Sequence, residues 1–312
     1  MPAAFSMIDA IGNTRMVELS SVVPASAARV VVKLESLNPT GSYKDRMAKA
    51  IIEAAEKRGD LQPGMTVVEY TGGSTGSSLA FMCAVKGYRL VIVTSDAFAP
   101  EKLRTIAAFG AELVIVPSEG GVITPDLIPR MRDRASEIAR ADGAFATDQF
   151  NNRDALTGYH DIATELIATL PEPVSMFCAG VGTAGMLMGA AEGFRRSGQA
   201  TRIVGFEPAS SPLLSQGIKG SHHIEGVGVG FRPPLLDDNL VETVLPVDEH
   251  EARTMARRLA REEGLLAGTS TGMNVAGAIA LARDLGPQHI VATVAVDSGL
   301  KYLSGDLFRI ES

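Results

Sequence analysis

Short apolar runs rich in valine and isoleucine alternate with helical patterns along most of this 312-residue chain. This alternation is typical of βαβ units, in which parallel strands are joined by helices. We expect an α/β fold with mainly parallel, twisted sheets. The expected strands are 65–70, 90–94, 112–117, 174–179, 202–207 and 290–297, and the expected helices are 77–86, 100–109, 127–141, 186–196, 248–263 and 274–285.

A seam is expected where the strand-like segment 144–147 runs into the polar segment 148–152. A strand, a glycine-rich turn and a helix occur on each side of it, so two open α/β lobes with a cleft between them are predicted. The smaller, mobile lobe would comprise residues 35–147, and the larger lobe residues 1–34 and 148–312. Ligands of such sheets bind beyond the carboxyl ends of the strands, where the glycine-rich turns collect.

Net charge and amino-acid composition indicate which kind of molecule this protein binds. The formal charge is −7 with a pI near 5.4, and no run is rich in lysine or arginine, which argues against nucleic-acid and acidic-membrane surfaces and favours small metabolites. No basic leader and no apolar run of roughly 18 residues is found, so a cytoplasmic protein is expected. The two cysteines and five histidines show no metal-ligand spacing, and no metal is expected.

Lys44 is a candidate nucleophile. The turn-forming segment 38–43 leads into an amphipathic helix, and Ser42 and Asp45 have capping-box spacing, which predicts a helix starting at Ser42 with Lys44 about two residues inside it. The helix dipole there lowers the pKa of the amine, and a neutral amine can form a Schiff base. The alternative is a solvated lysine. Lys33, the other serious candidate, is expected to point to solvent or into an ion pair.

Two glycine-rich loops each follow a strand and open a helix. Residues 71–76 offer free backbone amides that suit a carboxylate or a phosphate, although a tight turn with hydroxyl caps is the alternative. Residues 180–185 match G-x-G-x-x-G, and Glu207 lies 22 positions beyond Gly185, as in a dinucleotide site. Because Pro208 follows that acid and a dinucleotide gives Lys44 no role, we favour a single phosphate on the amides of 182–186.

Two further loops are candidates. Residues 268–272 open a helix, where serine and threonine commonly act as N-caps. Residues 226–231 contain too many glycines for a sound strand interior and suggest close approach to a ligand.

Taken in order, seven blocks of this chain resemble the cysteine synthase (O-acetylserine sulfhydrylase) and cystathionine β-synthase family of pyridoxal-phosphate enzymes, of the tryptophan synthase β-like fold. The blocks are 11–14, 33–35, 38–46, 71–76, 182–186, 226–231 and 262–268. The resemblance implies pyridoxal 5′-phosphate as cofactor, an amino-acid substrate and a homodimer.

The resemblance also implies roles for residues. Lys44 matches the lysine that binds the cofactor covalently and acts as catalytic base. The cofactor-binding residues would be Lys44, Ser74, Gly182, Thr183, Ala184, Gly185, Met186, Gly226 and Ser270. The residues that receive the substrate would be Thr71, Gly72, Gly73, Thr75 and Gln149. Ser270 would face the pyridine nitrogen, and a neutral hydroxyl there makes the ring a weaker electron sink than a carboxylate would, which favours β-elimination or β-replacement.

The implied reaction is β-replacement on an O-activated L-serine, with O-acetylserine and sulfide giving cysteine and acetate. The alternatives are a β-eliminating lyase such as a serine or threonine dehydratase or a cysteine desulfhydrase, an NAD(P)-dependent oxidoreductase using Gly180–Gly185 and Glu207, and a scaffold without turnover. The family usually reads Thr-Ser-Gly-Asn-Thr-Gly in the substrate loop, whereas this chain has Gly72 and Ser74. Either another group compensates, or a bulkier substrate uses the vacated space.

Overall fold

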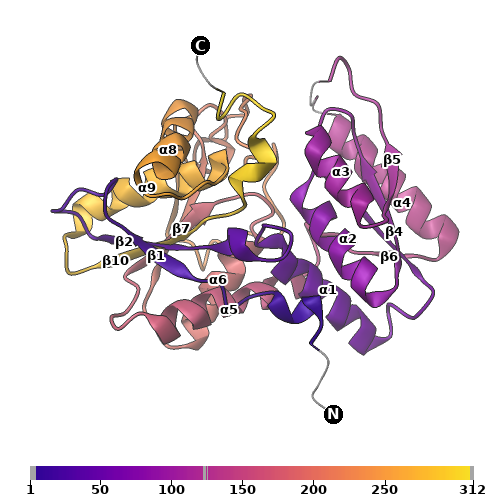
Figure 1. Ribbon diagram of the computed structural model, residues 1–312, viewed down its shortest axis with the longest axis horizontal. Helices are drawn as coiled ribbons and strands as arrows, with labels where there is room; N and C mark the ends of the chain where they lie inside the picture. Colours follow the sequence, from indigo (N-terminus) through magenta and orange to yellow (C-terminus); the bar gives the residue numbers. More distant parts are fainter. Residues whose placement is uncertain (1–4, 122–123, 125, 310–312) are drawn as a thin grey trace. The chain divides into compact units, whose positions relative to one another are not determined.

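The computed structural model describes residues 5–121, 124 and 126–309, and the chain divides into two compact units (Figure 1). The first unit comprises Met1–Ile11 and Asn38–Gly158, and the second comprises Gly12–Leu37 and Tyr159–Ser312. Each unit has its own, mainly parallel sheet flanked by helices, so the predicted α/β class with two lobes is confirmed.

The first unit is built on a parallel four-stranded sheet of order β5-β4-β3-β6. Successive side chains of a strand point to opposite faces, and these strands use both faces. Val67 and Ile92 enter a core with helices α1 and α2, whereas Val68 and Val93 enter a second core with α4. The elements are α1 (Lys44–Arg58), β3 (Thr66–Tyr70), α2 (Ser74–Lys86), β4 (Arg89–Thr94), α3 (Pro100–Ala108), β5 (Glu112–Ile115), α4 (Leu127–Asp142) and β6 (Phe145–Ala146), preceded by the 3-10 helix Met7–Ala10.

The second unit is built on a six-stranded sheet of order β1-β2-β10-β7-β8-β9, in which only β1 is antiparallel to its neighbour. Helices α8 and α9 cover one face. On the other face Phe177 of β7 packs against Phe194 of α6, with ring centroids 5.6 Å apart. The elements are β1 (Met16–Leu19), β2 (Arg29–Lys33), α5 (Asp154–Thr169, which begins in the first unit), β7 (Met176–Gly180), α6 (Gly185–Arg196), β8 (Arg202–Pro208), α7 (Leu213–Gln216), β9 (Thr243–Val247), α8 (Glu249–Glu262), α9 (Thr269–Leu285) and β10 (Ile290–Val294), with 3-10 helices at Glu35–Leu37 and Gly299–Tyr302.

The lobe boundaries differ from the prediction. The N-terminal segment belongs to the first unit because Ile8 and Ile11 pack into its core. Residues 148–158 also belong to it, since Gln149 hydrogen-bonds Thr75 and Asp154 pairs with Arg58. Residues 1–4 and 310–312 of the predicted ranges lie outside the described part of the chain.

Among the strands and α-helices of the described residues, the sequence patterns missed β1, α5, α7 and β9. Helix α5 contains Gly158, which weakens a helical pattern. A Cβ at Gly158 would lie 2.3 Å from the carbonyl oxygen of Arg46, so the glycine lets α5 approach α1 closely. Helix α9 begins at Thr269, five residues before the expected start. Its first turn consists of small and polar residues, which carry no helical pattern of apolar side chains.

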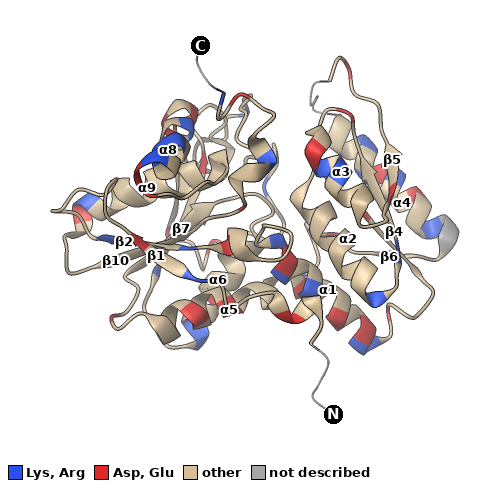
Figure 2. Ribbon diagram, in the orientation of Figure 1, with Lys and Arg blue, Asp and Glu red and all other residues tan. Residues whose placement is uncertain are grey.

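Basic and acidic side chains are interspersed along exposed helices, as Figure 2 shows for α8. There Arg258 and Glu262 form an i,i+4 pair with an Nε–Oε1 distance of 2.7 Å. Within the described residues no helix is long and apolar enough to cross a membrane, and no group of His, Cys, Asp and Glu is placed to hold a metal ion.

Candidate active site

Lys44 is the first residue of α1. The predicted capping box is wrong, because the Ser42 hydroxyl accepts from the Lys44 amide at 3.2 Å and Asp45 turns back to Thr40. The Asp45 carboxylate accepts from both the amide and the hydroxyl of Thr40 at 2.8 and 2.6 Å. Asp45 therefore links the preceding turn to the helix. The helix begins at Lys44 instead of Ser42, so Lys44 lies at the positive end of the helix dipole and not about two residues inside the helix.

The amine of Lys44 is buried, with 8% of the residue exposed. Burial disfavours the ammonium form and lowers its pKa to about 8, although the nearby Glu69 carboxylate acts in the opposite direction. An amine with that pKa is neutral for roughly a quarter of the time at pH 7.5, whereas an ordinary lysine is neutral for about one part in a thousand. Lys44 therefore has the free amine that Schiff-base formation requires.

The predicted substrate residues lie together in the first unit. The Thr75 hydroxyl donates to Gln149 Oε1 at 2.7 Å, and the Thr71 hydroxyl accepts from the Gly73 amide at 3.2 Å. Helix α2 begins at Ser74, and its N-cap, Gly73, has no side chain to satisfy the first amides. Uncapped amides at a positive helix end suit a carboxylate.

Glu69 holds the residues on both sides of the substrate loop by hydrogen bonds, a role that no sequence pattern indicated. Its buried carboxylate accepts from the Thr147 hydroxyl at 2.7 Å and from the amides of Tyr70 and Gln149 at 2.8 and 3.0 Å. Burial raises the pKa of Glu69 to about 7. This one side chain links the end of β3 to the segment that carries Gln149.

The space expected beside Gly72 is filled. A Cβ at Gly72 would lie 2.4 Å from Cε1 of Phe98, so the ring occupies the room that a side chain at position 72 would need. The expectation that Gly72 leaves an empty space for a bulkier substrate is therefore wrong, because Phe98 fills that space.

The predicted phosphate loop lies between β7 and α6 in the second unit. The Gly180 amide donates at 2.7 Å to the Oδ1 atom of Asn274, whose Nδ2 donates to the Val294 carbonyl at 3.0 Å. Asn274 is a buried polar residue in an apolar helix, a signal that the sequence analysis passed over. Ala184, the N-cap of α6, has φ 64° and makes no side-chain cap, whereas the Gly185 amide donates to the Thr183 hydroxyl at 3.4 Å. The start of this helix is a positive end that suits an anion.

The glycine loop 226–230 packs against the phosphate loop. A Cβ at Gly182 would lie 2.1 Å from the carbonyl oxygen of Gly226, so only glycine is compatible with this contact. The Gly228 amide also donates to the Val181 carbonyl at 3.1 Å. These two contacts hold the two loops at close range.

Ser270 is the second residue of α9 and is 3% exposed. The helix N-cap is Gly268, so Ser270 does not cap the helix. In the described part of the chain no protein group hydrogen-bonds its hydroxyl. A nearly buried hydroxyl without a protein partner is suited to a ring nitrogen of a bound cofactor.

Glu207 does not serve a dinucleotide. Its carboxylate accepts from the amides of Leu214 and Ser215 at 2.7 and 2.8 Å, and from the Ser215 hydroxyl at 2.6 Å. Both oxygens are thus used to cap α7. The oxidoreductase alternative is wrong, because the acid that it needs for a ribose is occupied within the protein.

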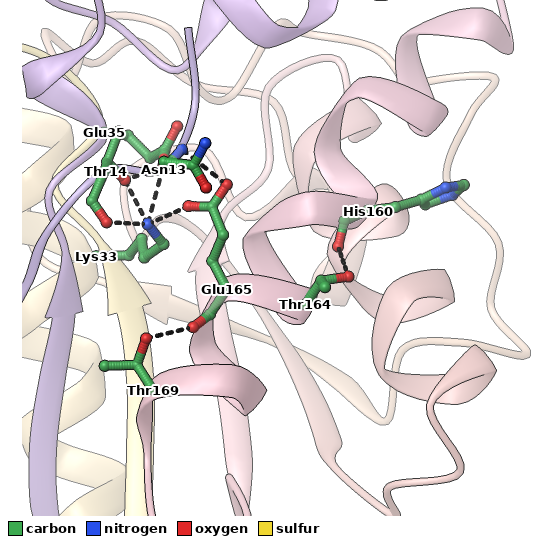
Figure 3. A network of polar contacts seen from close by, with 8 residues as sticks. All are labelled: Asn13, Thr14, Lys33, Glu35, His160, Thr164, Glu165 and Thr169. Carbon is green, nitrogen blue, oxygen red and sulfur yellow. Dashed lines mark hydrogen bonds and ion pairs between the residues drawn. The ribbon is translucent and has the colours of Figure 1, made fainter. Parts of the chain in front are cut away.

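Lys33 lies in a buried polar network in the second unit (Figure 3). Its Nζ atom lies 2.5 Å from Glu165 Oε2 and donates to the carbonyl and hydroxyl oxygens of Thr14. Glu35 accepts from the Thr14 hydroxyl at 2.8 Å, and Glu165 also accepts from the Asn13 amide. Lys33 is held within the protein by these ion pairs and hydrogen bonds, so it is a structural residue and not a nucleophile.

Two α/β units, a buried lysine whose pKa is lowered and glycine-rich loops at the starts of two helices are the features expected of a pyridoxal-phosphate enzyme. The chain belongs to the cysteine synthase family of pyridoxal-phosphate-dependent enzymes, since the profile of the family described as "Pyridoxal-phosphate dependent enzyme" matches residues 7–296 and curated relatives align over nearly its whole length. The predicted family, enzyme class and cofactor are thereby confirmed.

Three relatives illustrate the similarity. The chain is 39% identical over 304 residues to a cysteine synthase of Staphylococcus aureus, covering 96% of each protein. Among solved structures it is similar to an O-ureido-L-serine synthase, with a TM-score of 0.89, 36% identity and coverage of 98% and 96% of the two chains. It is also similar to the cysteine synthase of Entamoeba histolytica, with a TM-score of 0.91, 30% identity and coverage of 99% and 92%.

Proposed function

We propose that this protein catalyses β-replacement on an O-activated L-serine, with O-acetyl-L-serine and sulfide giving L-cysteine and acetate. The observation that carries the proposal is the buried Lys44 amine, whose pKa is lowered to about 8 at the start of α1. Relatives named cysteine synthase and O-ureido-L-serine synthase support the choice of an O-activated serine.

Three groups fit the cofactor. Lys44 Nζ would bind its aldehyde carbon, the amides of Gly182–Met186 would bind its phosphate, and the Ser270 hydroxyl would donate to its ring nitrogen. Ser74 and Gly226 would lie near it. When bound, pyridoxal phosphate withdraws electrons from the substrate Cα and makes its proton acidic.

Lys44 would also move the proton. With substrate bound, Nζ would accept the Cα proton, and a pKa near 8 suits a group that accepts and returns a proton near neutral pH. The loop Thr71–Thr75 and Gln149 would orient the substrate by its carboxylate, which brings Cα within reach of Nζ. The Cβ–O bond would break as acetate leaves, sulfide would form the new Cβ–S bond, and Nζ would return the proton to Cα.

Product analysis tests this function. The purified protein, supplied with pyridoxal phosphate, O-acetyl-L-serine and sulfide, should form cysteine and acetate in equal amounts. Release of pyruvate and ammonia at the same rate with and without sulfide would favour the β-eliminating lyase instead. Gel filtration with light scattering tests the proposed homodimer, and cell fractionation tests the proposed cytoplasmic location.

A further inference from the structure

Glu69 accepts hydrogen bonds from two segments of the first unit that are distant in the sequence. Its Oε1 atom accepts from the Tyr70 amide at 2.8 Å, and its Oε2 atom accepts from the Thr147 hydroxyl at 2.7 Å and the Gln149 amide at 3.0 Å. The residue is 2% exposed. Each carboxylate oxygen thus faces a backbone donor, and the side chain joins the end of β3 to the turn after β6.

This arrangement suits a side chain that accepts at both oxygens. An ionised carboxylate does so, whereas a glutamine would turn its NH2 group toward the amide of either Tyr70 or Gln149. Burial raises the pKa of Glu69 to about 7, although the hydrogen bonds that it accepts act in the opposite direction. At pH 8 the carboxylate form therefore predominates.

The turn that carries Gln149 is tight. Asp148 has φ 47°, in the left-handed region, which is uncommon for residues other than glycine. Its carboxylate accepts from Asn151 Nδ2 at 2.9 Å, and its carbonyl accepts from the amides of Asn151 and Asn152. These bonds close the turn, whereas the bond from the Gln149 amide to Glu69 attaches it to β3.

The side-chain amide of Gln149 has a defined orientation. Nε2 lies 3.3 Å from the Tyr70 carbonyl oxygen, which can only accept, so the nitrogen and not the oxygen of the amide faces it. Oε1 then faces Thr75, whose hydroxyl donates its single hydrogen there at 2.7 Å. The Thr75 hydroxyl has no second hydrogen, whereas Nε2 carries one. Of these two side chains, Gln149 is therefore the donor for an incoming carboxylate.

We propose that Glu69 is a positioning residue for the substrate carboxylate: by holding the backbone of Gln149, it keeps Nε2 of that glutamine in place to donate to the carboxylate. Glu69 acts through Gln149 and not on the substrate itself. The inference rests on the proposed function through the assignment of Gln149 to the substrate. The hydrogen bond between the Gln149 amide and Glu69 is independent of that assignment.

Amide hydrogen exchange in the cofactor-free protein at pH 8 tests the hold on Gln149. Glu69→Met should speed exchange of the Gln149 amide by at least roughly tenfold, because it removes the acceptor and adds no donor. Glu56→Met is the matched control, since Glu56 accepts from the side chains of Lys86 and Tyr88 in the same unit, and the exchange rate should stay that of the wild type. An unchanged rate in Glu69→Met would overturn the proposal.

Kinetics at pH 8 test the effect on the substrate. Glu69→Met should lower kcat/KM for O-acetyl-L-serine by roughly fivefold or more, and change kcat/KM for sulfide, which has no carboxylate, by less than about twofold. In the Gln149→Ala background the same substitution should lower kcat/KM for O-acetyl-L-serine by less than about twofold, because the group that Glu69 positions is gone. Equal falls in both backgrounds would overturn positioning through Gln149.

Glu69→Asp separates position from charge and is the milder substitution. It keeps the negative charge near Lys44 but withdraws the oxygens by one methylene, so they cannot reach both backbone amides. The pH midpoint of cofactor uptake should stay near 8, the pKa of Lys44, while kcat/KM for O-acetyl-L-serine falls as in Glu69→Met. An aspartate variant with wild-type kcat/KM would overturn the proposal, because charge alone would then suffice.

The outcomes also separate this inference from the proposed function. A wild-type protein that turns over no O-activated serine would overturn the proposed function and, with it, the substrate role of Gln149. The exchange experiment would still decide whether Glu69 holds the Gln149 amide.

Discussion

The Thr75 hydroxyl donates a 2.7 Å hydrogen bond to Oε1 of Gln149, which joins the first turn of α2 to the segment after β6. Gln149 Nε2 donates in turn to the Tyr70 carbonyl, and its backbone amide donates to Glu69. The glutamine is thus fixed at both its backbone and its side chain. A substrate carboxylate on the adjacent amides would meet groups that are already oriented, so little ordering entropy would be lost on binding.

Lys44→Ala should abolish turnover, because it removes both the amine that binds the cofactor and the base for the Cα proton. Borohydride reduction of the wild-type holoenzyme, followed by peptide mass spectrometry, should place the pyridoxyl group on the peptide containing Lys44. Lys49→Ala, a partly exposed lysine on the same helix, should retain activity and labelling. A label on Lys33 or Lys301 would refute the assignment.

The uptake of cofactor by the apoprotein should depend on pH through Lys44. Only the neutral amine attacks an aldehyde, so the rate should rise with pH and reach half its plateau near pH 8, the lowered pKa of Lys44. Removing the negative charge of Glu69 should lower that pKa further. Glu69→Gln should therefore shift the midpoint below pH 8, whereas Glu53→Gln on the exposed face of α1 should leave it in place. Stopped-flow absorbance measures the midpoint, and a shift to higher pH in Glu69→Gln would contradict the electrostatic coupling.

Hydrophobic patterns were sufficient to predict most strands of the two sheets, whereas β1 and β9, the edge strands of the six-stranded sheet, were missed. Strands β3, β4 and β8 were located to within one residue because buried parallel strands are short runs of valine and isoleucine bounded by turns. Lys44 and the two glycine-rich loops could be found for a related reason, since each lies at a junction between elements. The roles of these residues in binding remain predictions.

Contacts between residues distant in the sequence could not be predicted in this way. Neither Phe98 nor Glu69 belongs to a local pattern that points to its partner, and only the packing of α3 and the turn after β6 brings each to the substrate loop. The start of α1 was misplaced for a similar reason. Asp45 has capping-box spacing, but Thr40 offers it two donors, and these bonds replaced the expected cap.

Ser270→Asp should reduce turnover by at least tenfold while the protein still binds cofactor. A carboxylate at this position favours the protonated ring nitrogen, which alters the electron demand on the substrate Cα. Steady-state kinetics and the absorbance spectrum of the bound cofactor check this. Ser270→Ala is the matched variant that adds no charge, and its spectrum should lie closer to that of the wild type. Rates and spectra of Ser270→Asp equal to those of the wild type would remove Ser270 from the site.

Glu165→Ala should lower the free energy of unfolding by about 3 kcal/mol, because it removes the nearer of the two carboxylates that pair with the buried Lys33 amine, at 2.5 Å against 3.9 Å for Glu35. Replacing both residues with methionine should recover part of the loss, since no buried charge then remains from this pair. Arg258→Ala in the exposed pair with Glu262 should cost less than about 1 kcal/mol. Urea denaturation measures all three, and a loss in Glu165→Ala as small as that of Arg258→Ala would contradict the importance of the pair.

Asn274→Leu should weaken cofactor binding, because it removes the hydrogen bond that holds Gly180 at the start of the proposed phosphate loop. The amide of Asn274 accepts from Gly180 and donates to Val294, so an apolar side chain of similar size leaves both backbone groups without these partners. Each unsatisfied buried group costs about 1–3 kcal/mol, and a loss of stability of about 2–4 kcal/mol is expected. Gly180 leads directly into Gly182–Met186, and a loop released at its first residue should bind pyridoxal phosphate at least tenfold more weakly.

Calorimetric titration of the apoprotein measures the affinity, and Asn239→Ala, in an exposed turn, is the control. A destabilised Asn274→Leu with wild-type affinity would mean that the asparagine supports the sheet alone and that the loop keeps its shape without it.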